Sequence, residues 1–473
     1  MSSLPQTTGA PIPTEKVLVE PYRVGTLTYT ARGLYVVLFW MLLGDFCLQI
    51  MEQLPNSLVP LQLRWAEASA ALIGFLTGSL PAMLGILLNP FIGVQSDRHR
   101  GPLGRRRPFL LWSTPLVVVA LLGLGFADPI ATLLSGLISS GAGVNSLKIG
   151  WMGACMVVFV VANTYIMQVY QFLFVDVIPA KVMGKFVGCY RAVGALGAFV
   201  FHRYLFGYAK SDIATIYTLA ALLYAASFLL LVWKVKEGEY PPPPPRSTEG
   251  KLSIFKSYFR DCFGHKIYWT TYSLSLFFWS ALVPFSTFLV FFGTQPGGSA
   301  TGYAPTIGLS LTDFGHIKGW CSLVGVPVFF IVGPLVDRYH PLRIAMIGLF
   351  LSMITFLACF FLAKDVASLN FWLIVNAGSQ AVYMGSYLAI LPRLLPRAKY
   401  GQFFTANQIF GFSGVVLAPV LCGWLIEAFH DYRLVFMWCG VCAGLSLMMC
   451  VLLYRQWRAL GGEAAYTPPN QVA

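Results

Sequence analysis

The chain has 473 residues, of which 57% are hydrophobic and only 11% are charged. Soluble domains carry about 25% charged residues, so this composition excludes a soluble globular protein and predicts a protein that crosses the membrane many times. The net charge of +13 would indicate nucleic-acid binding in a soluble chain, but in a membrane protein it reports topology, and we expect no nucleic-acid partner. The ten cysteines lie mostly inside apolar runs without metal-ligand spacing, so we expect neither a disulfide framework nor a metal site.

Twelve apolar runs follow a Pro- and Thr-rich amino-terminal tail at 1–32, in which no removable signal peptide is expected. Each run is long enough to span roughly 30 Å of hydrocarbon. The runs begin near Gly33, Ala70, Pro108, Ile149, Gly184, Ile213, Ile267, Gly315, Leu342, Leu369, Gln402 and Tyr432. The prediction is an all-α membrane protein with twelve transmembrane helices, divided into six-helix halves at 33–233 and 267–455 and followed by a tail at 456–473.

The loop between the second and third predicted helices, residues 98–107, contains five arginines and is called the arginine loop below. Guanidinium groups are excluded from hydrocarbon and favour the anionic inner leaflet. The face that includes this loop carries 24 lysines and arginines, against six on the opposite face and two within the fifth helix. The six are Arg64, Lys148, Lys210, Lys318, Lys364 and Arg433. We therefore expect a cell-membrane protein, in a bacterial inner or plasma membrane, with both termini in the cytoplasm.

A cytoplasmic linker is predicted at 234–266, between the two halves. Five consecutive prolines at 241–245 cannot continue a helix and mark the boundary. After them, Leu252, Phe255, Phe259 and Phe263 recur at helical spacing among basic residues. This pattern predicts an amphipathic helix on the inner leaflet, with binding to another protein as the alternative.

The arginine loop also carries a motif, in which Gly93 and Asp97-Arg98 are followed by a Gly-Arg-Arg-Arg-Pro-Phe run at 104–109. This motif resembles the loop between helices 2 and 3 of the major facilitator superfamily, and the closing run is similar to the sucrose-transporter branch of the glycoside/pentoside/hexuronide:cation symporters. A shorter version of the motif, with Gly333 followed by Asp337-Arg338, occurs at 333–338 in the second half. The resemblance implies a fold of two related six-helix halves. We expect a cytoplasmic gate at Gly93, Asp97, Arg98, Gly104, Arg105, Arg106, Asp337 and Arg338.

The sequence departs from those relatives where they couple transport to cations. Plant-type sucrose transporters have an aspartate on helix 4 and an arginine eleven residues later, but Val160 and Gln171 occupy the matching positions here. The cation-binding carboxylates of helix 2 in melibiose-type members have no counterpart between Ala70 and Gln95.

An internal repeat supports the division into two halves. Residues 178–186 parallel residues 395–403 at a constant offset of 217, which also pairs Gly194 with Gly411 and Gly197 with Gly414. In the fifth helix, small residues share one face and predict the close approach of another helix. They are Gly184, Gly188, Ala192 and Ala195.

Polar residues inside apolar helices are costly unless they face a cavity or a partner. Helices 1, 4, 7 and 10 carry stripes of such residues, and these helices line the central cavity in the transporters that the chain resembles. Amides and aromatic rings can bind the hydroxyl groups and the apolar face of a sugar without fixed charge. We expect a substrate site at Gln49, Asn163, Thr164, Gln168, Gln171, Trp279, Asn376, Gln380 and Tyr383. Hydrogen bonding between neighbouring helices is the alternative for each of these residues.

Two charged residues are candidates for proton coupling. Asp45 lies roughly 18 Å from the inner end of the first helix, near mid-membrane, and is the expected proton carrier. Arg191 can reach Asp45 or the cavity, or instead extend inward to Asp176. Glu52 is interpreted as an interfacial carboxylate, with an outer gate as the alternative. Residues near the outer ends are also interpreted as interfacial, namely His202, Arg203, His316 and Glu427.

Together these patterns predict a secondary active transporter for a neutral sugar or glycoside, driven by proton symport with alternating access. Transport of another small solute, or a non-transporting sensor or assembly protein on the same scaffold, is the alternative. No nucleophile and base constellation, phosphate-binding glycine loop or cofactor motif is found, so we expect neither an enzyme nor a cofactor beyond H+. We expect the protein to act as a monomer in the bilayer.

Overall fold

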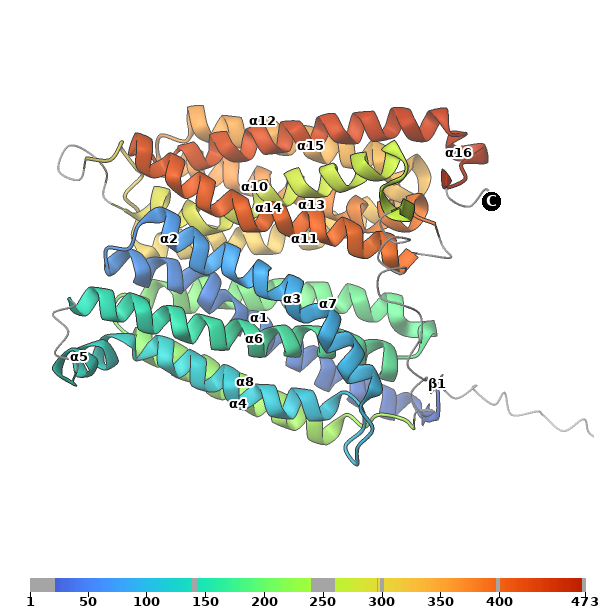
Figure 1. Cartoon of the computed structure of the whole chain (residues 1–473), viewed down its shortest axis with the longest axis horizontal. Coiled ribbons are helices and arrows are strands. Elements are labelled where there is room, and N and C mark those ends of the chain that lie inside the picture. The colour runs from blue at the N-terminus through green and yellow to red at the C-terminus, as the bar shows by residue number, and fades with distance from the viewer. Residues whose placement is uncertain are drawn as a thin grey trace, which may run out of the picture.

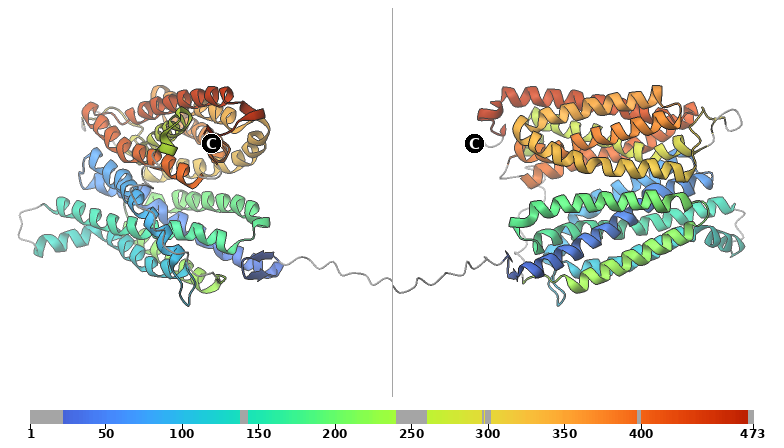
Figure 2. Two further views of the ribbon diagram at one scale, coloured as in Figure 1. Left: turned by 45° about the vertical axis from the view of Figure 1, so that its right-hand side comes forward. Right: turned by 180° about the vertical axis from the view of Figure 1, so that it is seen from behind.

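The computed structural model describes residues 22–137, 143–239, 260–295, 297, 302–396 and 400–469. Nearly all of these residues are helical and form two bundles, one above the other in Figure 1. Two further views show the same division, with the first half in blue to green and the second half in yellow to red (Figure 2). Strand β1, near the start of the chain, and helix α16, near its end, lie at the same end of the molecule. The expected all-α membrane fold is confirmed.

The first half follows a hairpin of two short strands, β1 (Tyr22–Val24) and β2 (Leu27–Tyr29). Two of its membrane-crossing segments contain a π-helical turn, which is a common sign of a functional region. The helices are α1 (Ala31–Trp65), α2 (Ala70–Gly74) with η1 (Phe75–Ser79) and α3 (Leu80–Arg98), α4 (Arg107–Gly125), α5 (Ala127–Leu137), α6 (Val144–Val177), α7 (Ala180–Val200) with η2 (Phe201–Leu205) and η3 (Phe206–Tyr208), and α8 (Ile213–Lys234).

From Lys266 onward, the described residues of the second half form six long helices and one short one. These are α10 (Lys266–Thr294), α11 (Leu311–Tyr339), α12 (Pro341–Leu362), α13 (Val366–Leu394), α14 (Tyr400–Phe429), α15 (Leu434–Ala459) and α16 (Gly462–Ala465). Among the described residues of both halves, ten helical segments are long and apolar enough to cross a membrane. The other two long helices of the bundles are α7 and α13, which carry polar residues such as Arg191 and Gln380.

The predicted linker falls largely outside the described residues. Its polyproline run and the apolar positions Leu252, Phe255 and Phe259 belong to that part of the chain. Phe263 is described, and its ring packs against Tyr272 of α10 and Phe410 of α14. This end of the linker therefore contacts the second half directly.

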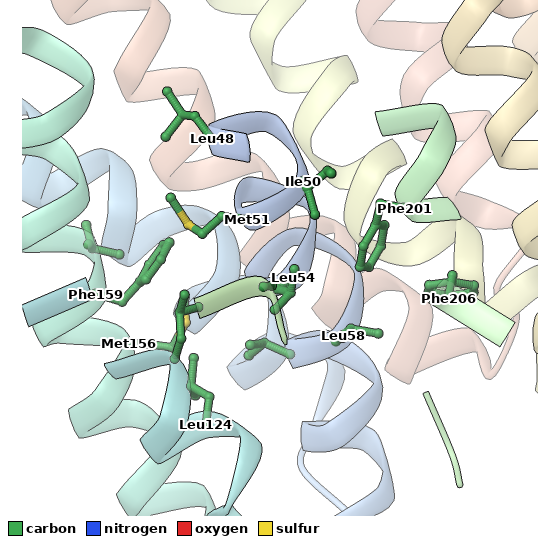
Figure 3. Packing of buried hydrophobic residues seen from close by; sticks show 14 of the residues in the cluster. Leu48, Ile50, Met51, Leu54, Leu58, Leu124, Met156, Phe159, Phe201 and Phe206 are labelled. Carbon is green, nitrogen blue, oxygen red and sulfur yellow. The ribbon is translucent and has the colours of Figure 1, made fainter. Parts of the chain in front are cut away.

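Helix α1 forms the centre of the first half. Its apolar side chains, including Met51, Leu54 and Leu58, are fully buried. They face Phe159 of α6 on one side and Phe201 of η2 on the other (Figure 3). Because α1 is covered on several sides, a polar side chain on it is enclosed by protein rather than exposed to lipid.

Glycines of the internal repeat bring helices together in the same way in both halves. A Cβ on Gly197 of α7 would lie 2.9 Å from the Phe46 carbonyl oxygen, and a Cβ on Gly414 of α14 would lie 2.4 Å from the Leu276 carbonyl oxygen. The second repeat pair makes matching contacts, because Gly194 of α7 contacts Gln49 of α1 and Gly411 of α14 contacts Trp279 of α10. The offset is 217 between α7 and α14 and 230 between α1 and α10, so the two halves are built on one plan.

The small-residue face expected on α7 is only partly covered in this conformation. A Cβ on Gly188 would have no neighbour within 4 Å. Farther along the same face, Phe199 packs against Trp320 of α11, with ring centroids 5.4 Å apart. Another helix therefore approaches this face near its far end, while the part near Gly188 is open.

Candidate functional site

The two halves are in close contact at the end of the bundle opposite the arginine loop. A Cβ on Gly423 of α14 would lie 2.7 Å from the Ala70 carbonyl oxygen of α2. On the other side of the interface, a Cβ on Gly315 of α11 would lie 2.4 Å from the His202 carbonyl oxygen of η2. We call this region, formed by α2 and η1 against α14 and by η2 and η3 against α11, the distal seal. Backbones this close leave no room for a channel between them.

Polar side chains reinforce the distal seal across the two halves. The Ala70 amide donates a hydrogen bond to the Glu427 carboxylate, and the Arg203 guanidinium bonds to Nε2 of His316. His202 is buried and its Nε2 lies 3.3 Å from the Ser57 hydroxyl of α1. The His202 contact lies within the first half, whereas the other two join the halves. The sequence analysis interpreted all four residues as interfacial, and the joining role of Arg203, His316 and Glu427 was missed because their partners lie more than a hundred residues away.

The arginine loop is held by acidic residues of the first half. Arg105 and Arg106 donate to the Asp176 carboxylate of α6 at 2.7 and 3.0 Å. Arg106 also donates to Asp97 at 2.5 Å and to the Ser96 hydroxyl at 2.5 Å. Planar guanidinium groups suit such multiple carboxylate contacts.

The Glu237 carboxylate, which follows α8 in the chain, caps the amino-terminal end of α4. The amides of Arg105, Arg106 and Arg107 donate to the Glu237 carboxylate at 2.8 to 3.1 Å. A negative charge at the start of a helix accepts hydrogen bonds from the free N–H groups and interacts favourably with the positive end of the helix dipole. Gly104 has a φ of +97°, a conformation that favours glycine and turns the loop into the helix. The sequence analysis anticipated neither the contacts of Glu237 nor the pairing of Asp176 with Arg105 and Arg106.

The remaining residues of the expected gate have different positions. Arg98 lines a surface groove beside Tyr165, and a Cβ on Gly93 would meet open space. The Arg338 guanidinium lies over the Tyr339 ring, while the side chain of Asp337 is outside the described part of the structure. The contacts above tie the arginine loop to its own half, so the cytoplasmic gate stays a prediction.

A cavity of about 640 Å³ lies between the halves, on the inner side of the distal seal. Residues from both halves line it, on α1, η1, α3, α10, α11 and α14. The polar ones are Gln53, Asn56, Ser57, Thr77, Ser286, Thr287, Lys318 and Gln408, and Trp279 contributes an aromatic ring. We call this space the central cavity.

Two chambers of about 200 Å³ adjoin the central cavity through shared lining residues. The first-half chamber shares Asn56 and Thr77 with the central cavity and includes Glu52. The second-half chamber shares Lys318. Amides and hydroxyls contribute to the lining of all three spaces, while apolar side chains such as Leu282, Val283 and Phe412 cover much of the central cavity.

Five of the expected substrate residues line these spaces. Trp279 faces the central cavity, Asn163 and Thr164 the first-half chamber, and Asn376 and Gln380 the second-half chamber. Asn163 donates to Glu52 at 3.4 Å. Asn376 donates to Thr355 at 2.8 Å and accepts from Gln380 at 2.5 Å, so it also joins neighbouring helices.

The other four expected residues are placed elsewhere. Gln49 lies on the α7 side of α1, and Gln168 and Gln171 lie one and two turns beyond Thr164, with Gln171 exposed. Tyr383 is fully buried and packs its ring on Phe278 at 4.2 Å. Tyr383 therefore belongs to the core of the second half, because helical spacing alone does not distinguish a cavity face from a core face.

Asp45 is completely buried between α1 and α7. Among the described residues, neither carboxylate oxygen has a partner at hydrogen-bonding geometry, although Gln49 and Tyr190 stand beside it and Arg191 is within electrostatic range. Arg191 itself is exposed, and its alternative partner Asp176 is instead bound by the arginine loop. The structure thus leaves Arg191 on the Asp45 side of α7.

The second half contains a neutral counterpart of this site. An offset of 230 relates Asp45 to Ser275, and an offset of 217 relates Tyr170 to Tyr387. Ser275 donates to Asn407 at 2.7 Å and lies 3.0 Å from the Tyr387 hydroxyl, to which Asn407 also donates at 2.9 Å. The neutral network is complete, whereas the acidic one is not.

Two charged residues were placed wrongly by the sequence analysis. Glu52 lines the first-half chamber instead of the membrane interface, because α1 has 35 residues and continues to Trp65, well beyond an ordinary span. Lys318, counted on the outer face, lies two turns inside α11 and lines the central cavity, because that helix begins at Leu311 rather than near Gly315. Helix ends are the hardest feature to read from sequence.

Comparisons with known proteins agree with this architecture. The family model described as Major Facilitator Superfamily matches residues 24–419 and 298–465. Over an alignment of 167 residues, this chain is 23% identical to the multi-drug resistance efflux pump PmrA of Streptococcus pneumoniae serotype 4. The alignment covers 33% of this chain and 41% of that pump.

Solved structures with low sequence identity share the fold. The nucleoside transporter NupG has a TM-score of 0.65 at 12% identity, covering 89% of this chain and 100% of its own. The inward-open xylose transporter XylE from E. coli has a TM-score of 0.63 at 12% identity, with 89% and 95% covered. A bacterial homologue of the iron transporter ferroportin in an inward-facing state gives 0.63 at 16% identity, with 89% and 99% covered.

Proposed function

Because the chain belongs to the major facilitator superfamily, we propose that it is a secondary active transporter that moves a sugar or glycoside by alternating access. The proposal rests on the central cavity, which lies between two repeated halves and is lined by both. Rocking of one half against the other exposes such a site to each side of the membrane in turn.

The chemistry of the lining supports a hydroxylated solute. Gln53, Asn56 and Gln408 offer amide donors and acceptors, and Trp279 offers a ring that can cover the apolar face of a sugar. A cavity of about 640 Å³ is within the usual range for small-molecule sites and is large enough for a sugar or small glycoside.

We place both termini in the cytoplasm, on the basis of the lysine and arginine distribution. With this orientation the distal seal is a closed outer gate, and the conformation is open toward the arginine loop. A Cβ on Gly188, in the inner part of α7, would have no neighbour within 4 Å, which agrees with a space between the halves that is open on the inner side.

We assign proton coupling to Asp45, with Arg191 as its charged neighbour. An isolated buried carboxylate is costly to keep ionised, which makes it suited to bind and release a proton as its surroundings open and close. Gln49 stands beside this acid, one turn farther along α1.

A transport assay tests the proposed function. Purified protein is reconstituted in vesicles and supplied with a panel of sugars, glycosides, sugar acids and nucleosides, with and without an acid-outside pH difference. We expect uptake of at least one hydroxylated sugar-class solute, accelerated by the pH difference and abolished by a protonophore. Transport of nucleosides alone would contradict the sugar assignment, and equal uptake with and without the pH difference would contradict proton coupling.

A further inference from the structure

Lys318 is a basic residue in the wall of the central cavity. It also lines the second-half chamber, so its side chain stands where the two spaces meet. Its position on α11 is two turns from the distal end, roughly 10 Å along the helix from Leu311. The ammonium group is therefore inside the transport path, just below the distal seal.

In the described part of the chain, no carboxylate pairs with Lys318. Its ammonium lies 5.6 Å from the centroid of the Phe285 ring, and its electrostatic neighbours are Cys321 and His202. Within the described residues it forms no ion pair with any carboxylate. The acid of the adjoining spaces, Glu52, belongs to the opposite half and accepts a hydrogen bond from Asn163.

A partly buried ammonium group without a counter-ion is unfavourable, and structures normally supply a partner. Here the open side of the ammonium faces a cavity built to hold a solute. Thr287 lines the central cavity and Gln380 the second-half chamber, so neutral donors are available to complete an oxyanion site beside the lysine.

We propose that Lys318 binds an anionic group of the transported solute, either a carboxylate or a phosphate, so that the substrate is an acidic member of the sugar class and not a neutral one. This inference rests on the proposed transport function for the identity of the ligand, but not for the existence of the anion site. The remaining hydroxyls of the solute then meet the amides of the central cavity.

Binding to purified protein tests the anion site without requiring transport. The probes are gluconate and glucose 6-phosphate, with glucose as the uncharged match, and the readout is the dissociation constant from calorimetry. We expect at least one acidic probe to bind more tightly than glucose. In Lys318→Met its affinity should fall about 10- to 100-fold, as expected when a charge-assisted bond is lost, while glucose binding stays unchanged. Which acidic probe responds distinguishes a carboxylate site from a phosphate site.

Two further variants separate charge from folding. Lys318→Arg keeps the positive charge and should bind the acidic probe within a few fold of the wild type. Lys364→Met removes an exposed lysine between α12 and α13 and should have no effect. If Lys318→Met weakens acidic and neutral probes equally, or weakens neither, the anion site is wrong. If the acidic probe binds through Lys318 but no solute of the panel is transported, the proposed function fails while the anion site stands.

Discussion

Asp45 shows how a single residue can be both isolated and well placed. It is fully buried, its oxygens have no hydrogen-bond partner in the part of the chain that the structure describes, and it stands within electrostatic range of Glu52 and Arg191. Position within an apolar run was enough to predict its burial, because a carboxylate in the middle of a membrane helix must be enclosed. The isolation of its oxygens could not be predicted, because it depends on how α7 packs against α1.

We predict that Asp45→Asn retains exchange of solute between two loaded compartments but loses accumulation driven by a pH difference. Asparagine mimics the protonated acid, so the conformational cycle continues while proton release is lost. Counterflow and gradient-driven uptake are measured on the same vesicles. A variant that still concentrates solute in proportion to the imposed pH difference would show that Asp45 is structural.

The cavity amides give a second prediction at the same scale. Asn163→Leu and Gln380→Leu should each weaken solute binding by roughly 1 to 3 kcal/mol, or about 5- to 150-fold, because solute hydroxyls lose their partners in a desolvated site. Gln171→Leu is the matched control, since Gln171 is on the same helix as Asn163 but exposed. The dissociation constant of a transported solute is measured for each variant. An equal loss of affinity in all three variants would disprove the assignment of Asn163 and Gln380 to the solute site.

At the scale of elements, the beginning of α4 depends on a residue far away in the chain. Glu237 accepts hydrogen bonds from three successive amides at that helix start, and Glu239 in turn donates its amide to the Thr26 hydroxyl of the hairpin. The arginine loop, the end of the first half and the hairpin are thus tied together. Helices themselves were predictable from apolar runs, but such a tie requires knowledge of which loops meet.

We predict that Glu237→Ala lowers the stability of the folded protein by about 1 kcal/mol, the usual cost of losing a helix cap. Glu239→Ala removes a neighbouring exposed carboxylate and keeps the backbone contact, so it should leave stability unchanged. Thermal unfolding in detergent compares the two variants with the wild type. Identical midpoints for all three proteins would mean that the cap contributes nothing.

At the scale of the whole molecule, two repeated halves meet through glycines and a few polar contacts at the distal seal. The repeat was visible in the sequence because its offset of 217 is constant over helices 4 and 5 and their counterparts. The distal seal was not visible in the sequence, because it joins residues such as Ala70 and Gly423, which share no sequence pattern and meet only in the folded protein. The positions of Glu52 and Lys318 were missed for a related reason, since α1 and α11 extend beyond their apolar stretches.

We predict that Gly423→Leu shifts the population toward a conformation with the distal end open, because a Cβ at this position would already be 2.7 Å from the Ala70 carbonyl oxygen. Spin labels at positions 210 and 364, exposed lysines on the distal face of the two halves, report the separation. Gly188→Leu fills open space on the other side of the molecule and serves as the control. An unchanged distance distribution in Gly423→Leu would rule out the seal as the contact that holds this conformation.

The neutral network around Ser275 bears on how many protons accompany one transport cycle, and so on how steep a solute gradient the pH difference can support. The position related to Asp45 holds a serine with its hydrogen bonds complete, so the second half has no acid at that position. If Asp45 alone carries the coupled proton, as proposed above, one cycle moves a single proton. Each unit of pH difference then supplies about 1.4 kcal/mol, enough for a tenfold concentration ratio. When that proton travels with a singly charged anion, the cycle moves no net charge, so the membrane voltage neither helps nor opposes it and the pH difference alone sets the ceiling.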